Sequence, residues 1–132
     1  MSARFINRIA VFSGLLLVVL LLQACSDRDV PRMPAQQWQE LNIVLQTRPL
    51  QLRPGMNEFL VIATDNRGLP GDDMVVSLRT NAAEPWSQSI QDGHSGVYRR
   101  AIKVRAGQRS VMLQLKRGKE QTVLEYPLLW AN

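Results

Sequence analysis

The sequence is poor in the residues that build catalytic and metal centres. Its 132 residues include one cysteine, Cys25, and one histidine, His94, and aromatic residues make up only 6% of the chain. A single cysteine excludes an internal disulfide, and no zinc-ligand spacing, phosphate-binding loop or nucleophile elbow occurs. Stability must therefore come from packing, and the sequence predicts no catalytic residue, no metal site and no enzyme.

The charge is mild and spread out. The formal net charge is +5, of which Arg4 and Arg8 contribute two units, and no long basic run occurs elsewhere. Nucleic-acid binding requires a clustered basic patch, commonly with interleaved aromatic side chains. The sequence therefore predicts no nucleic-acid partner, and it leaves a small-molecule ligand unknown. Its modest excess of positive charge suits acidic protein surfaces or lipid phosphates.

The amino-terminal segment has the features of an export signal. Arg4 and Arg8 form a positive region, and residues 9–22 form an apolar run that is rich in Leu and Val. This run is shorter than the roughly 20 apolar residues that cross a bilayer as a helix. We expect residues 1–24 to be a helical signal peptide, with an uncleaved anchor and a simple secretory signal as the alternatives.

The end of the apolar run resembles the lipobox of bacterial lipoproteins. Leu22, Gln23 and Ala24 precede Cys25 in the order of that motif, with Gln23 the weakest match. The resemblance implies cleavage between Ala24 and Cys25, a diacylglyceryl thioether on the Cys25 thiol and an acyl chain, typically palmitate, on its new amino group. Several acyl chains anchor a protein stably where one is marginal, so the expected partner of this end is the membrane.

The residues after the cysteine bear on location and organisation. Ser26 stands where Asp favours inner-membrane retention, so the outer membrane is favoured, although Asp27 keeps the inner membrane open. Residues 25–37 are polar and contain two prolines, which is typical of a flexible tether. We expect one domain over residues 38–132, facing the periplasm in the cell envelope.

Within residues 38–132, short apolar runs alternate with turn residues, which predicts an all-β fold. We expect one immunoglobulin-like antiparallel sandwich of about seven strands. In the strand expected over residues 58–64, residues 59–63 are apolar on both faces, as in a central strand, although the outward set could instead meet a partner. Ser77 and Arg79 should face outward. Residues 80–91 are predicted to form a loop with a short strand, pinned by Trp86 and Ile90. The positions expected in the core are Leu41, Ile43, Leu45, Leu50, Leu52, Met74, Val76, Leu78, Tyr98, Ile102, Val104, Val111, Leu113, Leu115, Leu124, Tyr126 and Leu128.

Residues 50–128 resemble a known family. The order Leu-Arg-Pro-Gly-Met-Asn at 52–57, Thr-Asp-Asn-Arg-Gly-Leu-Pro at 64–70, Gly-Val-Tyr at 96–98 and Ala-Gly at 106–107 is similar to YtkA-like and FixH-like immunoglobulin-type domains. The resemblance implies an exported or tethered sandwich near copper handling or respiratory oxidase assembly. Metal-handling relatives carry Met and His after the third strand, whereas residues 81–86 here contain neither.

Few side chains suggest chemistry. His94 lies in a Gly-flanked turn, and the adjacent Asp72 and Asp73 suit a turn better than a catalytic pair or a calcium site. A copper(I) site needs several soft ligands, but the methionines at 33, 56, 74 and 112 fall in separate segments. We interpret Met74 as a core residue.

Positive charge is concentrated on one predicted strand, which carries Arg99, Arg100, Lys103 and Arg105. Four further cations follow at Arg109, Lys116, Arg117 and Lys119. A solvated face accounts for most of this charge, and acidic partners or lipid phosphates are the alternative. Residues 127–130 form either a last strand with a capping Trp or an exposed docking peptide. The sequence thus predicts a lipid-anchored envelope protein that binds other envelope proteins, with copper or oxidase assembly as the alternative function.

Overall fold

The structure of the protein is a computed structural model that describes residues 31–132. The predicted signal peptide, the cleavage position at Ala24 and the lipidation site at Cys25 lie outside the described residues. Within residues 31–132, no helix is long and apolar enough to cross a membrane.

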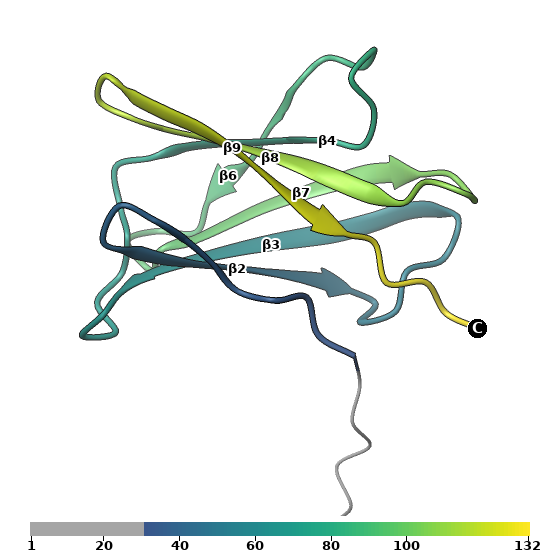
Figure 1. The fold of residues 1–132 in the computed structure, drawn as a ribbon, viewed down its shortest axis with the longest axis horizontal. Coiled ribbons are helices and arrows are strands. Elements are labelled where there is room, and N and C mark those ends of the chain that lie inside the picture. The colour runs from purple at the N-terminus through teal and green to yellow at the C-terminus, as the bar shows by residue number, and fades with distance from the viewer. Residues whose placement is uncertain (1–30) are drawn as a thin grey trace, which may run out of the picture. The chain divides into compact units, whose positions relative to one another are not determined.

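Two antiparallel sheets face each other (Figure 1). The first has the strand order β1-β2-β3-β7-β6 and the second has the order β5-β4-β8-β9. The strands are β1 (Gln36–Trp38), β2 (Leu41–Arg48), β3 (Gly55–Asp65), β4 (Val75–Arg79), β5 (Ser87–Gln88), β6 (Ile90–Gln91), β7 (Val97–Val104), β8 (Ser110–Arg117) and β9 (Glu120–Pro127). The prediction of an all-β sandwich is therefore confirmed.

The strand order is that of an immunoglobulin-like sandwich. Strands β2, β3, β7 and β6 take the places of A, B, E and D, and β4, β8 and β9 take those of C, F and G. The chain changes sheets between β5 and β6, where the amide of Ser89 donates to the carbonyl oxygen of Val76 at 2.7 Å. This change leaves β6 only two residues long, which determines the shape of the sheet edge described below.

Alternating apolar residues account for most of the strands. In β2 and β8 every second side chain is buried, as expected when one sheet face covers a core and the other meets solvent. Strand β3 lies between β2 and β7, and Leu60 is buried on its outer side as well. The predicted central strand over residues 58–64 is thus confirmed, and it extends to Gly55–Asp65.

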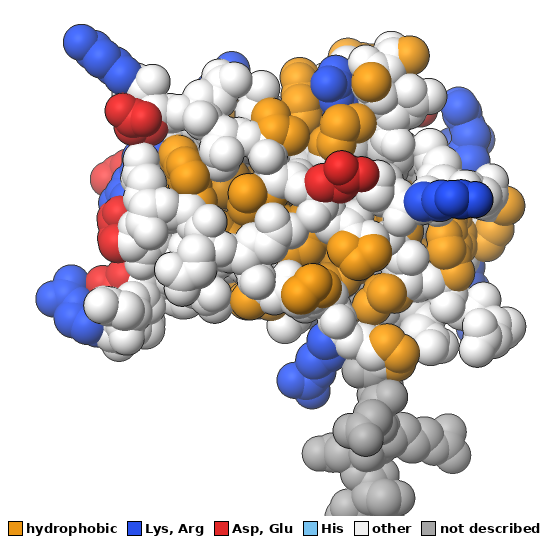
Figure 2. Space-filling model, in the orientation of Figure 1, with side chains coloured by type: hydrophobic (Ala, Val, Ile, Leu, Met, Phe, Trp, Pro, Cys, Tyr) orange, Lys and Arg blue, Asp and Glu red, His pale blue; other side chains and the backbone are white. Residues whose placement is uncertain are grey.

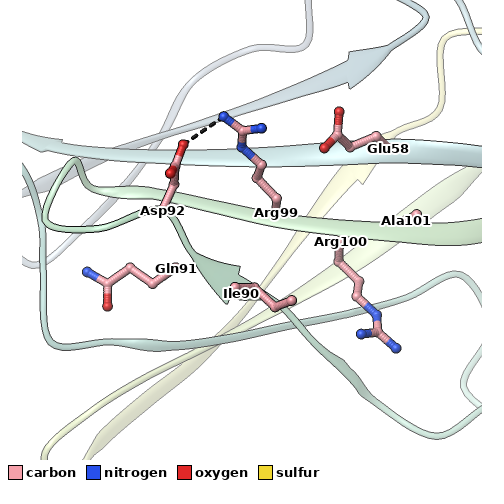
Figure 3. Close-up of a pocket in the computed structure, with 7 residues that line it drawn as sticks. All are labelled: Glu58, Ile90, Gln91, Asp92, Arg99, Arg100 and Ala101. Carbon is pink, nitrogen blue, oxygen red and sulfur yellow. Dashed lines mark hydrogen bonds and ion pairs between the residues drawn. The ribbon is translucent and has the colours of Figure 1, made fainter.

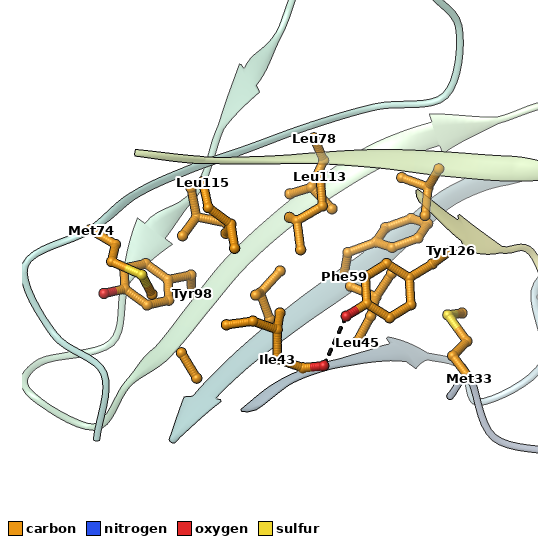
Figure 4. Close-up of a cluster of buried hydrophobic side chains, with 14 of the residues drawn as sticks. Met33, Ile43, Leu45, Phe59, Met74, Leu78, Tyr98, Leu113, Leu115 and Tyr126 are labelled. Atoms are coloured by element: carbon orange, nitrogen blue, oxygen red, sulfur yellow. Dashed lines mark hydrogen bonds between the residues drawn. The ribbon is translucent and has the colours of Figure 1, made fainter. Parts of the chain in front are cut away.

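The core lies between the two sheets and is closed by two tyrosines (Figure 4). The Tyr126 hydroxyl donates across the sandwich to the carbonyl oxygen of Ile43 at 2.8 Å, and the Tyr98 hydroxyl donates to that of Gly71 at 2.9 Å. Burial raises the pKa of both phenols, that of Tyr126 to about 12. Each hydroxyl therefore fastens backbone that lies far from it in sequence.

Two tight turns depend on particular residues. The buried side-chain amide of Asn57 donates to the carbonyl oxygens of Arg53 at 2.8 Å and Gly55 at 3.0 Å, which closes the turn before β3. Gly96 has φ +71°, and a Cβ there would lie 2.5 Å from the carbonyl oxygen of Ala63. Only glycine fits that position, because the entry to β7 packs directly on β3.

The start of the fold and the β2–β3 connection differ from the sequence prediction. Met33 is buried in the core beside Tyr126 (Figure 4), and β1 begins at Gln36, so ordered packing starts ahead of Trp38. Leu50 was expected in the core but is 62% exposed, because β2 ends at Arg48. Leu52 is buried as predicted, through a parallel bridge to Trp130 near the other end of the chain.

Two predictions for residues in β4 and β6 were wrong. Ser77 was expected to face solvent but is buried, because β4 is covered on both sides, by Gln88 of β5 and by Gln114 of β8. Ile90 was expected to pin the preceding loop but is 71% exposed. Met74, Val76 and Leu78 are buried as predicted.

Candidate functional site

Three titratable residues, His94, Asp72 and Asp73, lie near the Gly-flanked turn. His94 is 93% exposed, and its Nδ1 lies 3.8 Å from a carboxylate oxygen of Asp72. The other Asp72 oxygen accepts a hydrogen bond from the Gln91 amide at 3.2 Å, and Asp73 adopts φ +60° in the connection before β4. No group of three or more His, Cys, Asp or Glu side chains among residues 31–132 is placed to hold a metal ion.

The four methionines of the described chain lie at separate places. Met33 and Met74 are both buried, at opposite ends of the core cluster (Figure 4). Met56 is paired with Lys103 on the outer face of the first sheet and is 66% exposed. Met112 lies on β8, in the other sheet, opposite Glu125. The fold does not bring these thioethers together into one ligand set.

The carboxyl-terminal segment is fastened to the sandwich. The amide of Leu52 donates to the carbonyl oxygen of Leu129 at 2.9 Å, and Ala131 donates to that of Leu52 at 3.0 Å. The indole N–H of Trp130 donates to the carbonyl oxygen of Gln108 at 2.8 Å. Of the two readings of residues 127–130, the structure supports a strand end with a capping Trp.

Strand β7 carries the predicted basic cluster, and alternation divides its charge between two sides. Arg99, Ala101 and Lys103 lie on the outer face of the sheet, where Arg99 forms a 2.6 Å ion pair with Asp92. Arg100 stands opposite the buried Phe59 and so begins on the core side, yet it is exposed.

An open groove lies on β7 beside β6 (Figure 3). It has a volume of 390 Å³ and includes Ile90, Arg99, Arg100 and Ala101 among its lining residues. In Figure 3, Arg99 and Arg100 point to opposite sides of the strand, and only Arg99 meets a carboxylate. The groove therefore combines the exposed side chain of Ile90 with the guanidinium of Arg100, which forms no ion pair within residues 31–132.

A second groove, of 310 Å³, lies further along the same strand. Ala101 also lines this groove, together with Ile102 and Lys103, and Pro85 belongs to the facing wall. Arg105 and Glu84 also line this groove, and their side chains lie 3.8 Å apart. The two grooves meet at Ala101, so they form one continuous surface along β7, which we call the β7 flank.

In the second groove, the wall opposite β7 is stabilised by a contact between an arginine and a tryptophan ring. The guanidinium of Arg79 lies over the ring of Trp86, 4.2 Å from its centroid, and also donates to the carbonyl oxygen of Ala82 at 3.1 Å. Cation–π stacking of this kind orders an otherwise irregular segment. Trp86 thus pins its loop as predicted, although by stacking on Arg79 rather than by burial.

The remaining predicted cations do not join the β7 flank. Arg117 forms an ion pair with Glu40, and the hydrogen bond from that guanidinium lowers the pKa of the Glu40 carboxyl. On the face shown in Figure 2, Lys and Arg side chains project from the margins, and the hydrophobic groups in the middle are interrupted by polar atoms. Apolar side chains scattered in this way are normal for a protein surface.

Sequence reasoning identified the cations of the β7 flank but missed the grooves. The grooves depend on where β6 ends and on residues 84–87 lying beside β7, and both are long-range features. The sequence held one signal for the grooves, the stretch over residues 80–91 that has no alternating pattern. A stretch this irregular cannot form a strand long enough to pair with all of β7. The chain matches no family model, no curated protein and no solved structure significantly.

Proposed function

We propose that this chain is a lipid-anchored protein of the bacterial cell envelope, processed between Ala24 and Cys25. The support for the anchor lies in the sequence, where the only cysteine follows Leu22, Gln23 and Ala24 at the end of an apolar run. The acylated Cys25 holds the domain at the membrane, with the outer membrane favoured.

In this proposal the sandwich acts as a non-catalytic module that binds other envelope proteins. The observation that carries this part is the β7 flank, a pair of shallow grooves that share Ala101 and include Arg100 and Lys103, which form no ion pair with any residue of 31–132. β-Sandwich domains commonly serve as binding scaffolds. This analogy indicates that the fold can present a binding surface, and it identifies no particular partner.

Labelled palmitate and cross-linking test the two parts separately. The full chain should incorporate labelled palmitate, Cys25→Ser should abolish the label, and Ser26→Ala should retain it. Cross-linked capture from native envelopes should recover outer-membrane or cell-wall proteins with the wild type, and recovery should fall when Cys25 is replaced. Palmitate label that persists in Cys25→Ser would contradict the anchor.

The alternative is an accessory role in copper handling or oxidase assembly, as the family resemblance implies. Recovery of oxidase or copper-transport proteins in the same capture would favour that alternative. The dispersed methionines weigh against direct copper binding, and a copper(I) titration of the full chain that shows stoichiometric binding would reverse this judgement.

A further inference from the structure

The backbone of β7 has an uncovered edge. The amide of Ala63 donates to the carbonyl oxygen of Gly96 on the β3 side, and the amide of Asp92 donates to that of Val97 on the β6 side. Because such bonds alternate along an antiparallel strand, even-numbered residues of β7 pair with β3 and odd-numbered residues face β6.

Strand β6 covers only the beginning of this edge. The ladder ends where Ile90 pairs with Arg99, because the preceding residue, Ser89, bonds to the opposite sheet. The N–H and C=O groups of Ala101 and Lys103 therefore point to an edge to which no described strand is hydrogen-bonded, although Ser87 of β5 lines the adjacent groove. Within residues 31–132 these four groups have no hydrogen-bond partner. An exposed edge of this kind is a template for another strand.

The side chains around this edge favour one chemistry. Arg100 and Lys103 form no ion pair among the described residues, whereas the neighbouring Arg99 and Arg105 are already paired. On the inner side of the edge the second groove offers the partly exposed Ile102 and the exposed Pro85. An added strand would thus place alternate side chains beside Lys103 on the outer face and against apolar atoms on the inner face.

We propose that the β7 edge at Ala101 and Lys103 binds an extended acidic peptide by strand addition, with apolar residues alternating with Asp or Glu. This inference rests on the proposed interaction function and names the surface and the partner chemistry. Main-chain bonds to the edge supply affinity, and the alternating side chains supply specificity.

A second copy of this chain is a poor occupant of the same edge. Two β7 strands related by a two-fold axis could pair Ala101 with Ala101, Ala101 with Lys103, or Lys103 with Lys103. In the first two registers Lys103 or Arg105 of the second copy would reach the place opposite Arg99, which Ile90 already occupies. In the third register Lys103 lies opposite Lys103. Like charges directly opposite on paired strands are destabilising. An acidic strand meets no such penalty.

The test uses the full chain, labelled with nitrogen-15, in micelles of a neutral detergent. The probes are two capped synthetic peptides, (Glu-Val)4 and (Lys-Val)4, and the readouts are amide chemical shifts and hydrogen exchange. Adding (Glu-Val)4 should shift the Ala101 and Lys103 amides and slow their exchange, with weaker binding at higher salt. Equal binding of (Lys-Val)4, or shifts confined to other strands, would overturn the proposal.

Ala101→Pro removes an N–H that faces the open edge and leaves the bonds to β3 intact, a placement that edge strands tolerate. It should weaken (Glu-Val)4 binding by about tenfold or more, since one hydrogen bond is lost and the ring obstructs pairing. Gln121→Pro is the matched control, because Gln121 occupies an outward-facing position on the free edge of β9. It should leave binding unchanged.

Lys103→Glu is a second variant, which keeps the backbone and should transfer preference from (Glu-Val)4 to (Lys-Val)4. Unchanged preference in Lys103→Glu, unchanged affinity in Ala101→Pro, or a dimer in sedimentation that Ala101→Pro dissolves would each refute acidic strand addition. These outcomes are independent of palmitate labelling and envelope capture, so a failure here is distinguishable from a failure of the proposed function.

Discussion

Replacing Tyr126 with Phe removes one hydroxyl from the core and leaves the ring in place. In the wild type this hydroxyl donates to the Ile43 carbonyl oxygen at 2.8 Å, from one sheet to the other. A buried hydrogen bond contributes about 1 kcal/mol net to folding. At pH 7 we therefore expect Tyr126→Phe to lower the free energy of unfolding by about 1 kcal/mol.

The same substitution should change how stability depends on pH. Burial raises the pKa of Tyr126 to about 12 in the folded protein, whereas an unfolded tyrosine titrates near pH 10. The unfolded chain thus releases this proton first, and stability from Tyr126 is fully present below pH 10 and is lost as pH rises toward 12. At pH 11 the loss is about 1.4 kcal/mol, the equivalent of one pKa unit.

The two effects act in opposite directions on stability. The wild type should therefore be the more stable protein at neutral pH, and Tyr126→Phe the more stable one at high pH. Tyr126→Phe is less stable at pH 7, about equal to the wild type near pH 11, and more stable above it. Urea denaturation of both proteins at pH 7, 9, 10 and 11, followed by tryptophan fluorescence, measures the difference directly. Other titrating groups are shared by the two proteins and cancel. A difference that stays constant from pH 7 to 11 would refute the reasoning.

Two further predictions concern the turns that enter the first sheet. Gly96→Ala should destabilise the fold by more than about 3 kcal/mol, because its Cβ would meet the Ala63 carbonyl oxygen and φ is positive. Gly107→Ala, which has φ +87° but no atom within 4 Å of the added Cβ, should cost only about 1–2 kcal/mol. Thermal denaturation compares the two, and equal losses would contradict the steric argument. Asn57→Ala should cost about 1–3 kcal/mol because two turn carbonyl groups lose their donor. Asn66→Ala, at an exposed position, should change stability by less than about 0.5 kcal/mol, and a similar loss in both would show that Asn57 does not hold the turn.

The sequence predicted the fold wherever a residue's environment follows from its neighbours along the chain. Alternation alone placed Leu113 and Leu115 in the core, because a strand sends every second side chain to one face. Alternation failed at Leu50, which continues the apolar pattern of β2 but follows the end of the strand. It also failed at Ser77, whose burial depends on strands on both sides of it.

The candidate site was predictable in charge and unpredictable in shape. The concentration of Arg99, Arg100 and Lys103 on one strand is visible in the sequence. The open edge at Ala101 is not, because it requires knowing that the chain leaves the first sheet at Ser89. Short polar segments carry no periodic signal that distinguishes a two-residue strand from a longer one.

The bridge between Leu52 and Trp130 has a consequence for the order in which the protein assembles. Strand β9 supplies Tyr126, and the residues after it supply Leu128 and Trp130, the partner of Leu52, so the core is complete only when residues 126–130 are available. Contacts so distant in sequence form slowly. Under the proposed export across a membrane, the chain would remain without a complete core until residues 126–130 are available, and these residues would complete the core after passage.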